Sequence, residues 1–455
     1  MMNSLKRGYK ELKRYPSAVI GGVVVLMLVA LAIFAMVKIP YGEAIRLWRG
    51  GEDVWYQNPK NVPPVWYNWF TKEDLPASFA VKAGEDDEFV KEVTTRPNGT
   101  ADIRFEYDFE FDYDAFPQEM ILYFNTQYKS KQPFVSVSLI RPDESELKIG
   151  DFGIASKYTY RFSQDEALSK RINRLMRREI VNPVDGLFAV YESEPTQPLK
   201  GTYKLIIEGI TFEKDSDINV EFVSHGKVAG WFGTDHNRRD LTVAMLWGAP
   251  VALAFGLLAA IFTSVLSMII AAVGAWFGGW VDELIQRITE INLVLPFLAI
   301  LIMVGTFYSR SIWVILGVTV ALSIFTGTIK TDRAIFLQVK ESTYIEAARA
   351  YGASDLRIVF RYLIPRIIPL LIPALVSAVP SYVFLEASLA VLGLGDPVLP
   401  TWGKIINDAQ TFGALYKGMY YWILQPAVLL MFTGLGFAML GFALDRIFNP
   451  RLREM

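Results

Sequence analysis

The sequence contains no cysteine and only two histidines, His225 and His236. This scarcity excludes disulfide bonds, thiol catalysis and zinc clusters of cysteine and histidine, so we predict no metal site and no cofactor in this chain. The Gly-x-x-x-x-Gly-Lys-Ser/Thr pattern of phosphate-binding loops is also absent, which excludes ATP hydrolysis by that route. The 45 basic and 47 acidic residues almost cancel, and this balance argues against a nucleic-acid-binding protein.

Long apolar runs are abundant instead, since 52% of the residues are hydrophobic. The first run, 17–39, is long enough to cross a bilayer and longer than the apolar part of a cleaved signal peptide. Basic residues crowd 1–16, 331–366 and the C-terminus, which predicts that these three segments are cytoplasmic. We therefore predict a multi-pass protein of the cell membrane with six transmembrane helices, at 17–39, 249–276, 288–307, 312–330, 367–392 and 421–444.

A polar segment between the first two runs has the alternation of β-strands. After an aromatic-rich connector at 40–71, this insert covers 72–227 and precedes the helical remainder, 228–455. In "IRFEYDFEFDYD", apolar and aromatic residues alternate with charged ones, which is typical of a strand buried on one face. Further strands are predicted in "MILYFNTQY", "PFVSVSLIRP", "LFAVYESE", "GTYKLIIEGITF" and "INVEFVSH". The predicted fold is therefore mainly α, with an inserted extracytoplasmic β-sandwich-like domain.

The insert has two smaller features of interest. A helix is predicted to interrupt the strands, beginning at a cap formed by Ser163. Asn98 stands in an Asn-Gly-Thr sequon, which indicates glycosylation on an exterior surface but is equally typical of a plain turn.

The charged segment "YIEAARAYGASDLRIVFRYLIP" separates two of the apolar runs. Ser342 or Thr343 can cap a short helix, and Gly352 can end it because glycine adopts positive φ freely. Ser354 or Asp355 can then start a second helix that runs as far as Pro365. The pattern predicts a cytoplasmic helix-turn-helix that a partner protein could receive in a groove, with an ordinary basic loop as the alternative.

This segment resembles the EAA loop of ATP-binding cassette importer permeases. Glu346, Ala347, Ala348, Gly352 and Pro365 match the spacing of that motif, and Ala353 and Asp355 lie within it. The sequence departs from the motif where Tyr362 and Ile364 replace the usual isoleucine and leucine. The resemblance implies that the loop docks into a cleft of an ATPase subunit and transmits its motion.

Two further stretches resemble the C-type permease subunit of the dipeptide, oligopeptide and nickel branch of these importers. The first is the signature before the second span, with Arg238 in place of its glycine, and it contains Gly233, Thr234, Asp235, Arg239 and Asp240. The second covers 386–409 and contains the candidate pathway or gating residues Glu386, Gly393, Gly395, Asp396 and Trp402. The resemblance implies the type I importer permease fold.

The same resemblance implies a set of partners. These are a second homologous permease, two ATPase subunits that bind ATP and Mg, and an extracytoplasmic solute-binding protein. The expected function is import of oligopeptides, and the alternative cargo is a di- or oligosaccharide such as a cello-oligosaccharide. A different class of function, a membrane-tethered extracellular hydrolase or binding domain, would place a pair of catalytic carboxylates in the insert.

Overall fold

The computed structural model describes residues 15–97, 100–191, 193 and 196–448, in two compact units. One unit is helical and combines Met1–Arg49 with Val243–Met455, and the other is the β-rich unit Gly50–Thr242. The β-rich unit extends beyond the predicted insert, 72–227, at both ends. The sequon residue Asn98 lies outside the described residues, as do the basic N-terminus at 1–14 and the last seven residues.

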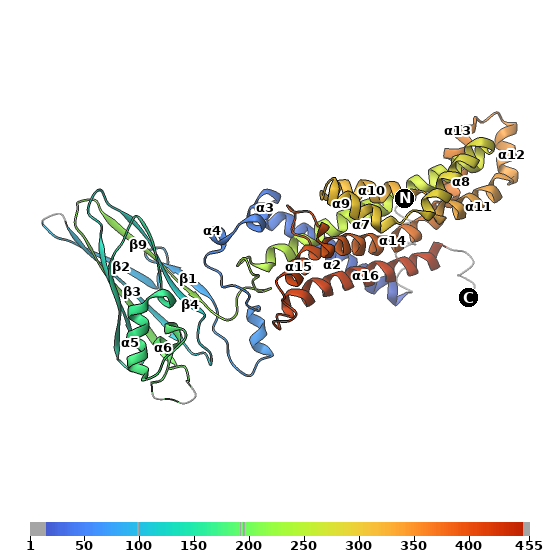
Figure 1. The fold of residues 1–455 in the computed structure, drawn as a ribbon. Coiled ribbons are helices and arrows are strands. Elements are labelled where there is room, and N and C mark those ends of the chain that lie inside the picture. Colours follow the sequence, from blue (N-terminus) through green and yellow to red (C-terminus); the bar gives the residue numbers. More distant parts are fainter. Residues whose placement is uncertain (1–14, 98–99, 192, 194–195, 449–455) are drawn as a thin grey trace. The chain divides into compact units, whose positions relative to one another are not determined.

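Long apolar helices build the helical unit (Figure 1). Among the described residues, four are long and apolar enough to cross a membrane: α2 (Pro16–Lys38), α7 (Leu241–Phe277), the run Asp355–Leu394 and α16 (Tyr421–Phe448). Two bent pairs raise this number to six if each pair forms one span. They are α8 (Gly279–Val294) with α9 (Phe297–Phe307), bent by 77°, and α10 (Ile312–Ile324) with α11 (Gly327–Lys340), bent by 47°. Shorter helices of the unit are α3 (Tyr41–Arg49), α12 (Thr343–Ala350), α13 (Asp355–Ile358) and α15 (Trp402–Thr411).

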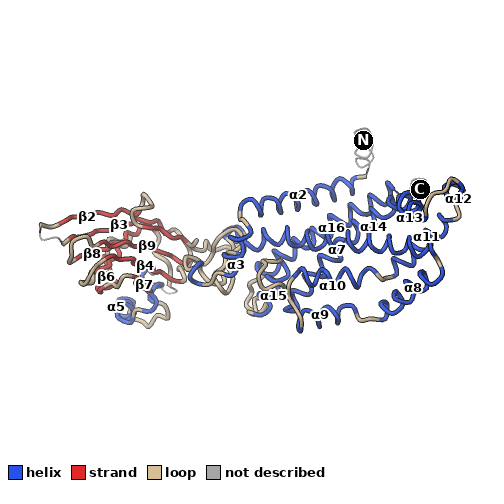
Figure 2. The backbone as a smooth tube through the Cα atoms, turned by 90° about the horizontal axis from the view of Figure 1, so that it is seen from above, coloured by secondary structure: helices blue, strands red, loops and turns tan. Residues whose placement is uncertain are grey.

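Glycines let the long helices approach one another closely. A Cβ atom added at Gly21 of α2 would lie 2.8 Å from the backbone oxygen of Gly436 in α16. A Cβ added at Gly441 of the same helix would lie 2.2 Å from the Ser377 hydroxyl in α14 (Ile364–Leu389). Small residues are the usual means of close helix packing in membranes, where burial of apolar surface supplies little driving force between helices. The helices α2, α14 and α16 therefore form a closely packed set (Figure 2).

Helix α14 carries irregularities at both ends and three internal prolines, Pro369, Pro373 and Pro380. A π-helical turn, Val359–Leu363, precedes it, and a second, Ala390–Leu394, follows it. The prediction that a helix stops at Pro365 is wrong, because Pro365 occupies the first turn of α14 and the helix continues. Proline is tolerated there because the preceding π-helical turn already interrupts the regular hydrogen-bond pattern of the helix.

The β-rich unit is a sandwich of two antiparallel sheets (Figure 2). One sheet has the order β1-β9-β4-β7, and the other has the order β2-β3-β8-β5-β6. The strands are β1 (Phe79–Lys82), β2 (Phe89–Thr95), β3 (Ala101–Phe111), β4 (Glu119–Gln127), β5 (Phe134–Ile140), β6 (Glu146–Gly153), β7 (Lys157–Arg161), β8 (Gly201–Thr211) and β9 (Asp217–His225). Side chains of both sheets alternate inward. In β3 every second residue from Ala101 to Phe111 is buried, and those from Ile103 onward lie in one shared core.

Most of the predicted strands are confirmed, with two corrections in the helical parts. The stretch "LFAVYESE" was expected to be a strand, but Leu187 and Phe188 end the helix α6 (Pro183–Phe188), which buries both residues in the sandwich core. The predicted cap at Ser163 is also wrong. The cap of α5 (Glu166–Met176) is Asp165, whose carboxylate accepts hydrogen bonds from the backbone N–H groups of residues 167 and 168.

Candidate functional site

The charged segment folds as the predicted pair of short helices. Helix α12 follows Ser342 and ends at Ala350, after which Gly352 adopts a φ of +77°. Helix α13 follows Ser354 and passes through the π-helical turn into α14. The Ser342 hydroxyl does not cap the helix, because it donates to the Val339 carbonyl oxygen at 2.6 Å instead.

Helix α12 presents one face to the surroundings and buries the other. Glu346, Ala347 and Ala350 are exposed, and Tyr351, just after the helix, is 92% exposed. Ala348 is buried, and Ile345 lies in a core shared with α7, α11 and α14. The predicted docking residues therefore divide between an outer face and an inner face, and only the outer face is open to a partner.

The inner face holds the C-terminal end of α7 through Trp276, which sequence reasoning missed. The Trp276 Nε1–H donates to an Asp355 carboxylate oxygen at 3.0 Å, and the Arg349 guanidinium lies 4.4 Å from a ring centroid of the indole. Lys340 Nζ donates to the backbone oxygens of Ala275 and Trp276, at 3.0 and 2.9 Å. A cation at the negative end of a helix dipole is stabilising, so α11, α12 and α13 together clamp the end of α7. We call Trp276, Lys340, Arg349 and Asp355 the tryptophan clamp.

The candidate gating residues gather where α14 ends and α15 begins. Asp396 accepts hydrogen bonds from the backbone N–H groups of Ile312 and Val398, at 2.9 and 2.8 Å, and so ties this turn to α10. Trp402 is fully buried and donates its indole N–H to the Met245 carbonyl oxygen at 3.0 Å. Gly393 has a φ of +85°, which lets the chain turn out of the helix. Glu386 is 6% exposed, one helical turn before the end of α14.

The signature residues Gly233–Asp240 form a tight turn ahead of α7 in the β-rich unit. The Asp235 carboxylate is buried, where it accepts from the Arg239 guanidinium at 2.6 Å and from two backbone N–H groups. Thr234 donates its hydroxyl to the Pro59 carbonyl oxygen at 2.8 Å, and Asp240 accepts from the Thr242 backbone N–H at 2.8 Å. Burial raises the pKa of both Asp235 and Asp240 above its ordinary value. These residues act as a structural lock on the turn.

This chain departs from the family signature at Arg238, and the contacts of this residue explain the substitution. It stands where the signature has glycine, and its φ is +65°, a conformation that glycine adopts without cost. Its guanidinium donates to the Asn58 carbonyl oxygen at 2.7 Å, lies 3.3 Å from His225 Nδ1 and lies 3.8 Å from a Glu52 carboxylate oxygen. The arginine therefore accepts backbone strain and gains contacts that glycine could not make.

Arg238→Gly is expected to lower the free energy of unfolding of the β-rich unit by about 1–2 kcal/mol, because relief of about 1 kcal/mol of strain does not offset the lost contacts. The measurement is thermal unfolding of the purified full chain. Glu144→Gly is the matched control, since Glu144 is exposed with a φ of +63° and its side chain makes no hydrogen bond or ion pair within the described residues. The explanation fails if both variants gain stability.

His225 gives the same network a dependence on pH. Its ring is 2% exposed, and the Nε2 atom lies 3.0 Å from the Tyr56 carbonyl oxygen. Burial, and after it the positive charge of Arg238, lower the pKa of His225 to about 4 from its ordinary 6.5. The neutral ring is therefore native, with Nε2–H donating to Tyr56 and Nδ1 accepting from Arg238.

The β-rich unit is expected to lose stability as the pH falls from about 6.5 to about 4. In this window the unfolded histidine binds a proton that the native ring does not, so the free energy of unfolding decreases by about 3 kcal/mol toward the lower pH and is unaffected above 6.5. Chemical unfolding of the full chain at a series of pH values measures how the free energy of unfolding changes with pH, and this dependence is the slope that the next variant tests. His225→Gln should remove most of it, and an unchanged slope in that variant would assign the effect to other groups.

No group of three or more histidine or acidic side chains within the described residues is arranged to hold a metal ion. The candidate functional elements are an exposed short helix, the tryptophan clamp beneath it, and the turn between α14 and α15.

Comparisons with known proteins agree with this arrangement. Residues 263–454 match the family model described as binding-protein-dependent transport system inner membrane component. The dipeptide transport system permease protein DppC of Bacillus subtilis is 29% identical over 225 residues, which are 49% of this chain and 69% of that protein. The oligopeptide transport system permease protein OppC of the same organism is 29% identical over 228 residues, which are 49% of this chain and 72% of that protein. The peptidoglycan transport system permease protein YejE of Agrobacterium fabrum is 33% identical over 181 residues, which are 40% of this chain and 47% of that protein.

The matched residues include α12, the tryptophan clamp and the turn between α14 and α15, whereas the sandwich lies outside the family model. Residues 263–454 therefore match an inner-membrane permease domain of the binding-protein-dependent transport family, and these similarities support a permease subunit of an ATP-binding cassette importer.

Proposed function

We propose that this chain pairs with a second, homologous permease to form the translocation pathway of an oligopeptide importer. Two ATPase subunits, which bind ATP and Mg, would receive α12 on the cytoplasmic side, and a solute-binding protein would deliver the peptide outside. In this arrangement both termini are cytoplasmic and the β-rich unit is extracytoplasmic. The observation that carries the proposal is the geometry of α12, which has an open outer face and an inner face fixed to three membrane helices.

Charge supports the orientation. Segment 331–366, which contains α12, includes Arg333, Lys340, Arg349, Arg357, Arg361 and Arg366, and short loops with this excess of basic residues remain in the cytoplasm. Closure of the ATPases would move α12, and the tryptophan clamp would transmit that movement to α7 and α14. A coupling of this kind needs an element that can adopt two positions, with the balance between them shifted both by the ATPase subunits and by the translocation pathway. Helix α14, with its irregular ends, is suited to that role.

Peptide cargo is supported by the relatives of this chain, which include dipeptide and oligopeptide permeases. We assign Glu386, Asp396 and Trp402 to the outer gate of the pathway, because a carboxylate in an apolar span usually faces the bundle interior or a water path. The hydrolase alternative is not favoured by the comparisons, in which the matched proteins are permeases.

The test is uptake into proteoliposomes that contain the full complex, with the cognate binding protein outside and ATP inside. Labelled oligopeptides and cello-oligosaccharides are supplied as separate pools. Uptake of peptides that requires internal ATP supports the proposal. Uptake of the sugar pool alone would overturn the cargo, and equal uptake without the ATPase subunits would overturn the coupling role of α12.

A further inference from the structure

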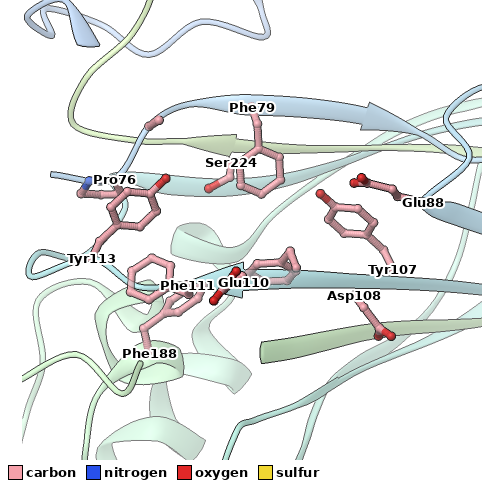
Figure 3. Close-up of a pocket in the computed structure, with 12 residues that line it drawn as sticks. Pro76, Phe79, Glu88, Tyr107, Asp108, Glu110, Phe111, Tyr113, Phe188 and Ser224 are labelled. Atoms are coloured by element: carbon pink, nitrogen blue, oxygen red, sulfur yellow. The ribbon is translucent and has the colours of Figure 1, made fainter. Parts of the chain in front are cut away.

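A cavity of about 350 Å³ opens between the two sheets of the sandwich, beside β1 and β3 (Figure 3). Half of its lining residues are aromatic. Phe79 comes from β1, and Tyr107, Phe109 and Phe111 come from successive inward positions of β3. Tyr113 and Phe188 complete the aromatic lining. The volume lies near the lower end of the range for small-ligand pockets, roughly 300–1,000 Å³, so it suits one long side chain rather than a whole peptide.

The strand pairing explains why the cavity is open. Strand β3 pairs with β2 only up to Tyr107, opposite Phe89, but it pairs with β8 as far as Phe111, opposite Gly201. One edge of 108–111 therefore has no neighbouring strand within the described residues. An unpaired strand edge offers backbone N–H and C=O groups to an extended peptide, and this edge lies along the aromatic cavity.

The surroundings of the cavity are acidic. Glu88, Asp108 and Glu110 contribute to its lining. Asp108 lies 3.6 Å from Lys204, whereas Glu88 and Glu110 are exposed and make no ion pair within the described residues. Figure 3 places Glu88 beside Tyr107. Burial, and after it the negative charges of Glu88 and Asp86, raise the pKa of Tyr107 to about 12, so its hydroxyl remains protonated.

We propose that this cavity binds the ammonium group of a lysine side chain in a short peptide, whose extended backbone lies along the free edge of β3. The aromatic rings provide the negative faces that attract a cation, and Glu88 and Glu110 supply the opposite charge at the mouth. An anionic ligand would meet these carboxylates and is excluded. This inference goes beyond the transport function, because it gives the β-rich unit a preference for cationic peptides of its own.

The experiment measures peptide affinity by calorimetry with the purified full chain in detergent, without any partner subunit. The probes are the tripeptide Ala-Lys-Ala and its acetyl-lysine counterpart, which has the same backbone but no side-chain charge. We expect the lysine peptide to bind at least about tenfold more tightly than the acetylated one. We also expect its affinity to fall about tenfold in the double variant Glu88→Gln with Glu110→Gln.

Two further variants make the test specific. The double variant Glu144→Gln with Glu146→Gln removes the same charge from exposed positions near β6 and should bind like the original chain. Phe79→Leu removes one ring of the wall and should weaken binding several-fold. The proposal is overturned if neither peptide binds, if both bind equally, or if the two double variants have the same effect. Because no transport is measured, it can fail while the importer function stands.

Discussion

Trp276→Ala is expected to reduce ATP-driven uptake by about tenfold or more while the ATPase subunits continue to hydrolyse ATP. The substitution removes the ring beneath Arg349 and the donor to Asp355, so that α12 can move without moving α7. Couplings between distant sites are typically worth about 1–3 kcal/mol, which corresponds to roughly 5–150-fold. The measurement is the ratio of uptake to ATP hydrolysis in proteoliposomes that contain the full complex.

Two controls separate coupling from loss of structure. Trp276→Phe keeps an aromatic ring under Arg349 and loses only the N–H, so we expect an intermediate ratio. Trp280→Ala removes a tryptophan that is 75% exposed on the neighbouring helix α8 and should leave the ratio unchanged. A normal ratio in Trp276→Ala, with complex assembly preserved, would show that α12 transmits its motion by another route.

Gly248→Ala is expected to destabilise the membrane domain by about 1–3 kcal/mol, although alanine normally stabilises a helix interior relative to glycine. A Cβ at this position in α7 would lie 2.2 Å from atoms of the Trp402 indole. The indole is buried and holds a hydrogen bond to Met245, so it cannot move away without losing that bond. The midpoint of thermal unfolding in detergent and the rate of uptake by the assembled complex should both decrease.

The matched control for this prediction is Gly317→Ala in α10. That glycine is also inside an apolar helix, but nothing lies within 4 Å of the added Cβ. We expect Gly317→Ala to be neutral or stabilising by up to about 1 kcal/mol. Equal unfolding midpoints for the two variants would mean that Trp402 does not pack rigidly on α7.

The sequence correctly predicted the helices and strands whose signals lie in a few neighbouring residues. The alternation in β3 identified a one-sided strand, and Gly352 identified the end of α12, because each depends only on neighbouring residues. Ser163 was misassigned as a cap because Asp165 two residues later is an equally good acceptor, and only the path of the chain chooses between them. "LFAVYESE" was misassigned because a short apolar run fits a buried helix end as well as a strand.

The candidate site was only partly predictable for a related reason. Glu346 and Gly352 belong to one continuous motif, whereas the clamp joins Trp276 to residues 64 to 79 positions later in the chain. A tryptophan at the end of an apolar run was an available signal, but it does not specify the contact. The role of Arg238 was hidden because a sequence shows the substitution but not the φ of +65° that makes it informative.

The prolines of α14 have a consequence for the direction in which this helix can bend. Successive residues of an α-helix are about 100° apart, so Pro369, Pro373 and Pro380 project within about 40° of one another on the same side. Each proline lacks the N–H that would bond the carbonyl oxygen four residues earlier, so the missing bonds also lie along one side. Such a helix is compliant in one plane and stiff in the others, and it can convert an uneven push at its N-terminal end into a tilt of fixed direction at the opposite end.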